Sequence, residues 1–267
     1  MSELVIASSG ADAHAAEAVT QHHAVMAGAL RLRIETLFTT ASHRDVAAGD
    51  AARRDLVDWC ERELVPHALA EEQAMYPAAR ATVEGRLLVE AMIGEHQVIT
   101  RLIRDVAGAD DLLRAAASAT ALGAVFDSHL TKENDLVLPL LAATPGVSVA
   151  GLLDGMHELL GAADHAADSE VDEGGAACGG HTCSCGEVDG PGYPELDVRS
   201  VPHAIRHATI FGALESVRPG AGLDLVAPHD PLPLLDQVDH RWPGVFSVTY
   251  RERGPEAWRL SLVRGDA

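Results

Sequence analysis

The sequence predicts an all-α four-helix up-down bundle followed by a small two-layer α+β domain. Three observations support this. From residue 11 to 166 apolar residues recur every three or four positions, which is the period of amphipathic helices. From Asp168 to Gly190 the chain becomes acidic and glycine-rich and loses that period. Beyond it, short stretches alternate apolar and polar residues with a period of two, as strands do.

Pro and Gly interrupt the first region sparsely, so its helices are expected to be long. We predict long helices over residues 11–40, 48–82, 85–107 and 111–141, and a shorter one over 147–166 after the Pro145-Gly146 break. Short connections between long helices favour an up-down-up-down arrangement around one core.

The C-terminal region is expected to be a mixed domain of order β-α-β-α-β-β. Strands are predicted over 193–199, 222–228, 244–250 and 257–263, and helices over 202–217 and 232–240. We therefore divide the chain into a helical bundle (11–166), an acidic linker containing Gly and Cys (167–192) and a C-terminal α+β domain (193–267).

The charge of the chain argues against two classes of partner. The 267 residues carry a formal net charge of -20 at pH 7. Nucleic acids and anionic membranes attract basic surfaces, so we predict neither as a partner. The cysteines do not form a secreted framework, no signal peptide opens the chain, and no apolar run reaches the roughly 18 residues that a membrane span needs. We therefore expect a cytoplasmic protein.

Two copies of one motif lie in the predicted bundle. HALAEEQAMYP begins at His67 and HLTKENDLVLP begins at His129, and each has a Glu four residues after its His. Positions i and i+4 share one face of a helix, so His67 pairs with Glu71 and His129 with Glu133. Both pairs interrupt apolar stripes and are therefore predicted to point into the core. The stripes are Cys60, Leu64 and Met75 on the second helix, and Leu122, Phe126 and Leu136 on the fourth.

The first and third helices each add a histidine. His96 lies on the stripe Met92, Ile99, Ile103 of the third helix. On the first helix His22 and His23 are adjacent, and only one can share the apolar face. We choose His23, because its helical repeat passes through Met26, Leu30, Ile34 and Leu37, whereas that of His22 passes through Ala29, Arg33 and Thr36.

A metal site is the interpretation that this set favours. A single histidine on an apolar face is more often an ordinary core residue, and an isolated His-Glu pair is more often solvated. Six such residues at the same depth in one core favour a metal site instead, because burying two carboxylates without a cation would be very unfavourable. The predicted ligands are His23, His67, Glu71, His96, His129 and Glu133.

The ligand types favour iron. Four imidazoles, two bridging carboxylates and a bridging oxide or hydroxide would leave about two positions open on a pair of six-coordinate ions. Mixed nitrogen and oxygen ligands with open positions suit non-haem iron or manganese, whereas zinc prefers four ligands. We expect two iron ions, with manganese or zinc as possible substitutes.

The four helical motifs resemble the hemerythrin-like HHE cation-binding domain over residues 12–165. HHAVM, HALAEE, GEHQVI and HLTKEN carry the resemblance. It implies a non-haem di-iron centre whose ligand positions match the six residues above. Oxygen carriers of this family have a second histidine one turn after the third-helix ligand, where this chain has Thr100. In this respect the chain resembles family members that are associated with oxygen or nitric oxide sensing, iron handling and repair of iron centres.

Residues 193–265 resemble the DUF2249 domain, which is similar to the TusA-like sulfur-carrier fold. LDVRSVPHAIRH and GPEAWRLSLVR are among the stretches that carry it. The reactive cysteine position of sulfur carriers corresponds to His203, so a persulfide relay is not expected here. His203, Arg206, His207 and His229 form either a ligand or metal pocket or a polar cluster that caps and pairs locally.

The cysteines give no single interpretation. Cys178, His181, Cys183 and Cys185 lie close together in the linker and form either a soft-metal or redox site or a set of exposed thiols. Cys60, on the apolar stripe of the second helix, is expected to be a core residue.

Two functions are compatible with these features. One is a module that binds a diatomic ligand, oxygen or nitric oxide, or responds to redox or iron status, and signals to a protein partner through residues 193–267. The alternative is a redox enzyme that reduces nitric oxide or peroxide, or that donates iron during repair of damaged iron centres.

Overall fold

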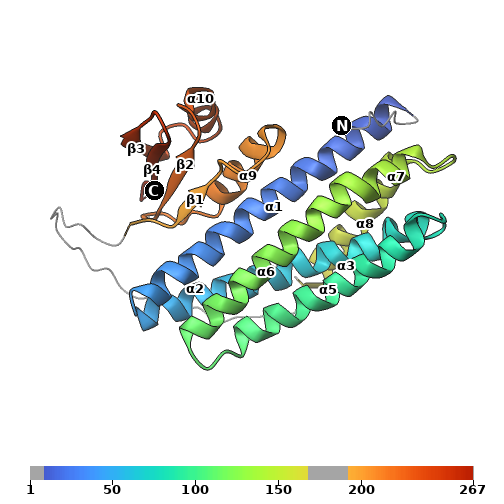
Figure 1. The fold of residues 1–267 in the computed structure, drawn as a ribbon, viewed down its shortest axis with the longest axis horizontal. Helices are drawn as coiled ribbons and strands as arrows, with labels where there is room; N and C mark the ends of the chain where they lie inside the picture. The colour runs from blue at the N-terminus through green and yellow to red at the C-terminus, as the bar shows by residue number, and fades with distance from the viewer. Residues whose placement is uncertain (1–8, 168–191, 267) are drawn as a thin grey trace.

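The structure, a computed structural model, describes residues 9–167 and 192–266. Figure 1 shows a bundle of long helices with a smaller domain, coloured orange to red, lying along its first helix. The predicted fold class is confirmed in both parts. The linker residues Cys178, His181, Cys183 and Cys185 lie outside the described residues.

Four long helical segments form the bundle. They are α1 (Gly10–Ser42), α2–η1–α3 (Val46–Trp59, Cys60–Leu64, Val65–Ala74), α5 (Gly85–Ala107) and α6–η2–α7 (Leu112–Lys132, Glu133–Val137, Leu138–Ala143), with the short α4 (Tyr76–Arg80) between the second and third. A further helix, α8 (Val149–Ala167), packs on α1 and α3. Within the described ranges no helix is both long enough and apolar enough to span a bilayer.

Local sequence fixes where these helices begin. The Ser9 side chain accepts a hydrogen bond from the Asp12 amide at 3.1 Å, and Asp111 accepts one from the Arg114 amide at 2.8 Å. Such caps satisfy backbone donors that a helix N-terminus leaves without an intrahelical partner. The predicted starts near residues 11 and 111 therefore agree with the structure to within a residue.

Two wide turns interrupt the helices that carry the paired motif. In η1 the Val65 amide bonds the carbonyl of Cys60, and in η2 the Leu138 amide bonds the carbonyl of Glu133, five residues back in each case. A proline lies two residues after each wide turn, Pro66 after η1 and Pro139 after η2. A proline has no amide hydrogen, and its ring clashes with the carbonyl four residues earlier, so the helical ladder opens there. Such π-turns are frequent at functional sites.

The wide turn at Glu133 makes one sequence prediction wrong. Leu136 was expected on the buried stripe of the fourth helix, but it is 50% exposed and Val137 is fully buried instead. The π-turn contains one more residue than an α-turn, so the next core position moves one residue along the chain. The other residues of the predicted stripes are buried, Cys60 among them.

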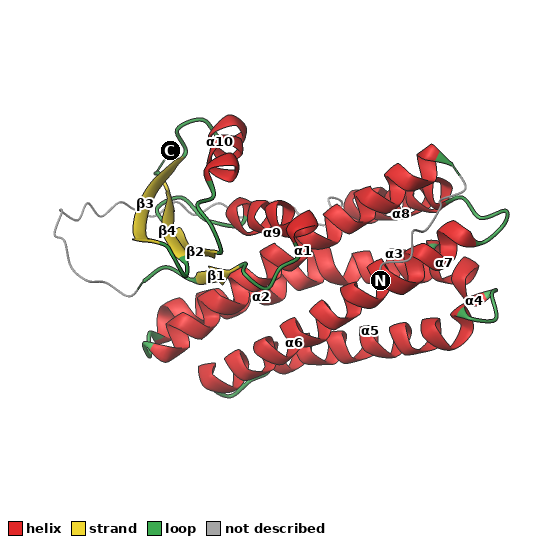
Figure 2. Cartoon of the chain, turned by 45° about the horizontal axis from the view of Figure 1, so that its top comes forward, coloured by secondary structure: helices red, strands yellow, loops and turns green. Residues whose placement is uncertain are grey.

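The C-terminal domain is a four-stranded sheet with two helices. The strands are β1 (Glu195–Asp197), β2 (Gly222–Ala227), β3 (Phe246–Arg253) and β4 (Trp258–Arg264), and the helices are α9 (His203–Glu215) and α10 (Leu232–Arg241). The strand order is β1-β2-β4-β3, with β1 parallel to β2 and the other neighbours antiparallel. Leucines of β2 and β4 and apolar residues of both helices form its core. Figure 2 shows α9 between the sheet and α1.

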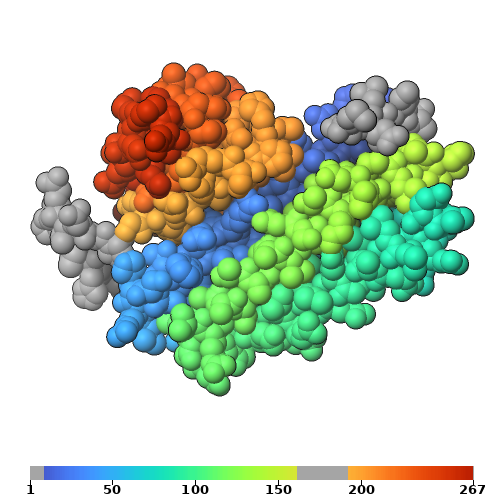
Figure 3. Space-filling view, in the orientation of Figure 1, coloured from blue at the N-terminus to red at the C-terminus, as the bar shows by residue number. Residues whose placement is uncertain are grey.

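The two domains are in close contact where α9 crosses α1. A Cβ added to Gly28 of α1 would lie 1.8 Å from the carbonyl oxygen of Thr209, and one added to Gly212 of α9 would lie 2.0 Å from that of Val25. Leu32 of α1 is only 5% exposed and packs within the core of the C-terminal domain. Figure 3 shows that domain seated along α1. The segment of α1 from Val25 to Leu32 is therefore covered by the C-terminal domain on the side that does not point into the bundle.

Candidate metal centre

The six predicted ligand residues converge in the middle of the bundle. All are buried, and the most exposed of them, His96, is only 6% accessible. His23 comes from α1, His67 and Glu71 from α3, His96 from α5, His129 from the end of α6 and Glu133 from η2. Each of the four long helical segments therefore contributes at least one imidazole. The two glutamates come from the two segments that carry the paired motif.

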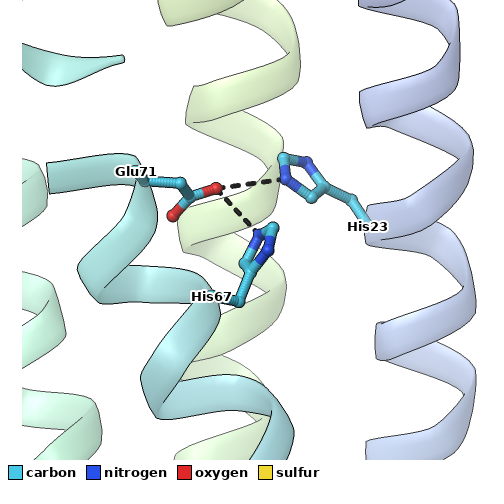
Figure 4. A group of neighbouring side chains, drawn as sticks. All are labelled: His23, His67 and Glu71. Atoms are coloured by element: carbon cyan, nitrogen blue, oxygen red, sulfur yellow. Dashed lines mark hydrogen bonds and ion pairs between the residues drawn. The ribbon is translucent and has the colours of Figure 1, made fainter. Parts of the chain in front are cut away.

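Glu71 lies between two groups of histidines. Its Oε1 is 2.9 Å from Nε2 of His67 and 3.3 Å from Nε2 of His23, as Figure 4 shows for these three side chains. Its other oxygen, Oε2, lies 3.6 Å from Nε2 of His96. The two oxygens of one carboxylate thus face different imidazoles, which is the arrangement of a bridging ligand.

Glu133 has a similar position on the opposite side. Its Oε2 is 3.5 Å from Nε2 of His129 and 3.7 Å from Nε2 of His23. The Nε2 atoms of His96 and His129 face each other at 3.1 Å. Two imidazole nitrogens and two carboxylates pointing at a common centre are difficult to satisfy with protons alone, whereas cations satisfy all of them.

The unpaired atoms fit a cation as well. Oε2 of Glu133 is buried and has no hydrogen-bond partner among the described residues. The same is true of Nε2 of His67, because its 2.9 Å approach to Glu71 does not have the geometry of a hydrogen bond. His23, His67 and Glu71 form one group whose ligand atoms lie within 4.8 Å of one another, and Glu71, His96 and His129 form a second. Imidazole nitrogen and carboxylate oxygen suit iron or manganese. The residues therefore fit a pair of such ions.

Comparison with known families agrees with this geometry. Residues 14–141 match the family described as hemerythrin HHE cation binding domain, and residues 195–264 match DUF2249, described as an uncharacterized conserved protein. The chain carries an HHE domain followed by a DUF2249 domain. No curated protein and no solved structure matches it. The family resemblance predicted from the sequence is therefore confirmed for both domains, and the HHE domain is a cation-binding domain.

Three outer residues bond the predicted histidine ligands from outside the cluster, and sequence reasoning missed them. Asn134 bonds Nδ1 of His23 at 2.9 Å, Glu72 bonds Nδ1 of His96 at 2.7 Å and Glu95 bonds Nδ1 of His129 at 3.2 Å. Accepting a hydrogen bond from Nδ1–H leaves the Nε2 lone pair directed at the centre of the cluster and raises the basicity of the imidazole. Each of the three is a sequence neighbour of a ligand, and that adjacency was the available signal.

Tyr76 was also missed. It is 1% exposed, and its hydroxyl donates to Oε1 of Glu133 at 2.6 Å, with Nε2 of His96 at 3.5 Å. Burial and the charge of Glu133 raise the pKa of Tyr76 far above its ordinary value, so the hydroxyl remains a donor. Tyr76 therefore fixes one oxygen of Glu133 and leaves Oε2 directed at the histidines.

Tyr76→Phe is predicted to destabilise the metal-free protein by about 1–3 kcal/mol, because a buried carboxyl oxygen loses its donor. Urea unfolding at pH 7 measures this. Tyr250→Phe is the matched control, since it removes a hydroxyl from a half-buried bond to Asp230. Tyr250→Phe should lower the free energy of unfolding by less than Tyr76→Phe does. Equal stability of Tyr76→Phe and the unmutated protein would contradict the role assigned to the hydroxyl.

In the absence of a cation, protons hold this cluster together. Burial alone would lower the pKa of His23, but bonds to Glu71 and the charge of Glu133 outweigh it and raise the pKa to about 9. Burial and the charge of Glu71 raise the pKa of Glu133 to about 8. Burial opposes ionisation of Glu71, yet the surrounding histidines hold its pKa well below the ordinary value. Burial and the charge of His96 lower the pKa of His129 to about 4.

The stability of the metal-free protein is therefore predicted to fall between pH 6.5 and 9. The raised pKa of His23 stabilises the fold fully below about 6.5, and this contribution is lost as pH rises through about 9. The raised pKa of Glu133 also stabilises the fold at low pH, and this contribution is lost completely above about pH 8. The contribution of His129, whose pKa is lowered, is fully present above 6.5 and does not oppose the trend. The loss from His23 is on the order of 3 kcal/mol.

Thermal unfolding across this pH range tests the prediction. The metal-loaded protein is the control, because cations displace these protons and remove their pH dependence. A metal-free protein that becomes more stable from pH 6.5 to 9 would contradict the assignment.

A surface cavity leads to one side of the centre. It has a volume of about 250 Å³ and is lined by His96, Thr100, Glu72 and several apolar residues. Thr100 occupies the position where oxygen carriers of the family have a further histidine, and its hydroxyl donates to the carbonyl of His96 at 2.9 Å. The small hydroxyl of Thr100, in place of an imidazole, therefore lines the same cavity as His96.

The polar residues of the DUF2249 domain do not come together as a ligand set. Arg206 donates to the carbonyl of Val201, His207 lies 3.2 Å from Gln237 and His229 lies 3.3 Å from the carbonyl of Asp230. The groups suited to a metal among the described residues do not include them or His203. For Arg206, His207 and His229 the observed contacts are pairs with single neighbouring groups, as in one of the two alternatives left by the sequence.

Proposed function

We propose that the HHE domain holds two iron ions bridged by Glu71 and Glu133. The observation that carries this proposal is that two groups of three ligand atoms share Glu71. A single ion would not explain why both oxygens of that carboxylate face imidazoles of different helices. Manganese or zinc can occupy the same ligands in place of iron.

The protein would then bind a diatomic ligand, oxygen or nitric oxide, and report ligand, redox or iron status through its DUF2249 domain. Iron in this site supplies a redox-active centre with positions open to a small ligand. Thr100, in place of a further imidazole, supports open positions, and the cavity at His96 supports access for a molecule of this size. The buried carboxylates and their partners keep the ligand set ordered while the charge of the ions changes.

The contact between domains supports signalling. His23 lies on α1, and the segment of α1 from Val25 to Leu32 packs against the DUF2249 domain. Arg33 of α1 donates to the hydroxyl of Ser216 at 2.8 Å, and Arg218 donates to Asp55 of α2 at 2.6 Å. A displacement of His23 along α1 would therefore reach α9 through directly packed backbone, and from there a protein partner of residues 193–267.

A redox enzyme is the second candidate, and the open cavity at His96 favours it. Nitric oxide or peroxide would be reduced by electrons from ferrous iron, which an external electron donor would restore between turnovers, or iron would be donated to damaged centres. Anaerobically loaded ferrous protein should be titrated with nitric oxide and with oxygen, and separately supplied with peroxide under turnover conditions. Stoichiometric binding without turnover supports the sensor, turnover well above that of free iron supports the enzyme, and failure to bind any of these molecules contradicts both.

A further inference from the structure

The outer partners of the ligands form a chain that runs around the bundle. Glu72 follows the α3 ligand Glu71 and bonds the α5 ligand His96. Glu95 precedes His96 and bonds the α6 ligand His129. Asn134 follows the η2 ligand Glu133 and bonds the α1 ligand His23. In each case the sequence neighbour of a ligand on one helix supports a histidine on the next.

Helix geometry explains this pattern. Successive residues of an α-helix are about 100° apart, so when one points to the centre of the bundle, its neighbour points to the seam with an adjacent helix. The chain of partners therefore passes from α3 to α5, from α5 to α6, and from η2 back to α1. Among the described residues, only the step from α1 to α3 lacks such an outer hydrogen bond, and the histidine that it would support is His67.

His67 is the exception among the four histidines. Its Nε2 faces Glu71, so its Nδ1 points away from the centre, and Nδ1 is buried without a hydrogen-bond partner among the described residues. The α1 residue in the corresponding position is His22, the neighbour of His23. The ring centroids of His22 and His67 are 5.1 Å apart. Both rings line a cavity of about 130 Å³ together with Leu153, Met156 and His157 of α8.

We propose that His22 is the positioning residue of His67: it accepts a hydrogen bond that Nδ1–H of His67 donates, directly or through one water in this cavity, and completes the ring of outer partners. A neutral imidazole has one nitrogen lone pair available for this role. The cavity is large enough for a water, and the three histidines that line it, His22, His67 and His157, offer polar groups to hold it. The adjacent histidines of α1 thus have different tasks, with His23 directed at the ions and His22 supporting a ligand on the neighbouring helix.

The inference rests on the proposed metal centre, and cobalt(II) loading of the full chain at pH 8 tests it. Two quantities are measured: cobalt affinity by competition with a chelator, and the exchangeable Nδ1–H proton signals that the paramagnetic ion shifts out of the normal range. His22→Phe keeps an aromatic ring but removes the acceptor. It should weaken cobalt binding by about 10–100-fold and make one shifted Nδ1–H signal exchange rapidly with solvent.

His22→Gln restores an acceptor oxygen and should recover most of the affinity and the slow exchange. His157→Ala removes the other histidine of the same cavity, on its α8 side, and should behave as the unmutated chain. Glu72→Leu, which removes the partner of His96, gives the reference effect for a lost outer bond. Equal losses in His22→Phe and His22→Gln would overturn the proposal, because the effect would then not depend on an acceptor.

The proposal is also wrong if His22→Phe keeps every slow Nδ1–H signal and full affinity while Glu72→Leu does not. An unmutated chain that takes up no cobalt would instead refute the metal centre itself, and this inference with it. The two failures are therefore distinguishable.

Discussion

Glu71→Ala is expected to abolish binding of both metal ions. Glu71 is the one side chain common to the two ligand groups, so its removal takes an oxygen from each. His67→Ala removes a ligand from only one group, and the second group, formed by Glu71, His96 and His129, stays complete. The expected metal content is therefore about two ions per chain in the unmutated protein, about one in His67→Ala and close to none in Glu71→Ala.

Metal analysis after anaerobic ferrous loading and removal of free iron measures this. Glu72→Gln is the matched control, since it lies next to Glu71 on α3 but supports His96 from outside the centre. Its amide oxygen can still accept the hydrogen bond from Nδ1–H of His96, so the variant should retain both ions. Circular dichroism of the metal-free variants shows whether the bundle is intact. Two ions retained by a folded Glu71→Ala protein would refute a bridging role for this carboxylate.

The bundle and the buried positions of its predicted ligands could be predicted from the sequence, because one physical rule governs both. A polar pair one turn apart within an apolar stripe must point into the core, and the positions of His67, Glu71, His129 and Glu133 follow from that rule. The rule assumes a regular α-helix, and it is wrong where the helix widens. Leu136 was assigned to the core because the π-turn from Glu133 to Val137 was not anticipated from Pro139.

The outer partners were not accessible in the same way. Glu72, Glu95 and Asn134 are ordinary polar residues for the surface of a helix, and only the packing of neighbouring helices directs them at a ligand. The docking of the DUF2249 domain is a stronger example. A glycine inside a helix normally weakens it, so Gly28 and Gly212 carry no sign of a contact until both helices are placed.

Gly212→Ala is expected to disrupt the contact between the two domains. In a helix without tertiary contacts this change would stabilise by about 0.5–1 kcal/mol. Here the new Cβ would lie 2.0 Å from the Val25 carbonyl oxygen, and backbone on both sides prevents a local adjustment. Overpacking of this kind costs about 1–3 kcal/mol or more, so the sign of the effect should reverse. Gly94→Ala in α5 is the matched control, because no atom lies within 4 Å of its added Cβ, and it should stabilise.

Separation of α9 from α1 would expose Leu32 and free the DUF2249 domain without touching a metal ligand. Hydrogen exchange of α9 and an increased radius of gyration in solution scattering would report it, while metal content should stay unchanged. Gly212→Ala therefore tests ligand binding and signalling between the domains separately. Nitric oxide should still bind to the metal centre, but any change in the hydrogen exchange of α9 on ligand binding should disappear. If that change persists in a domain that has come away from α1, the signal does not travel along the helix that carries His23.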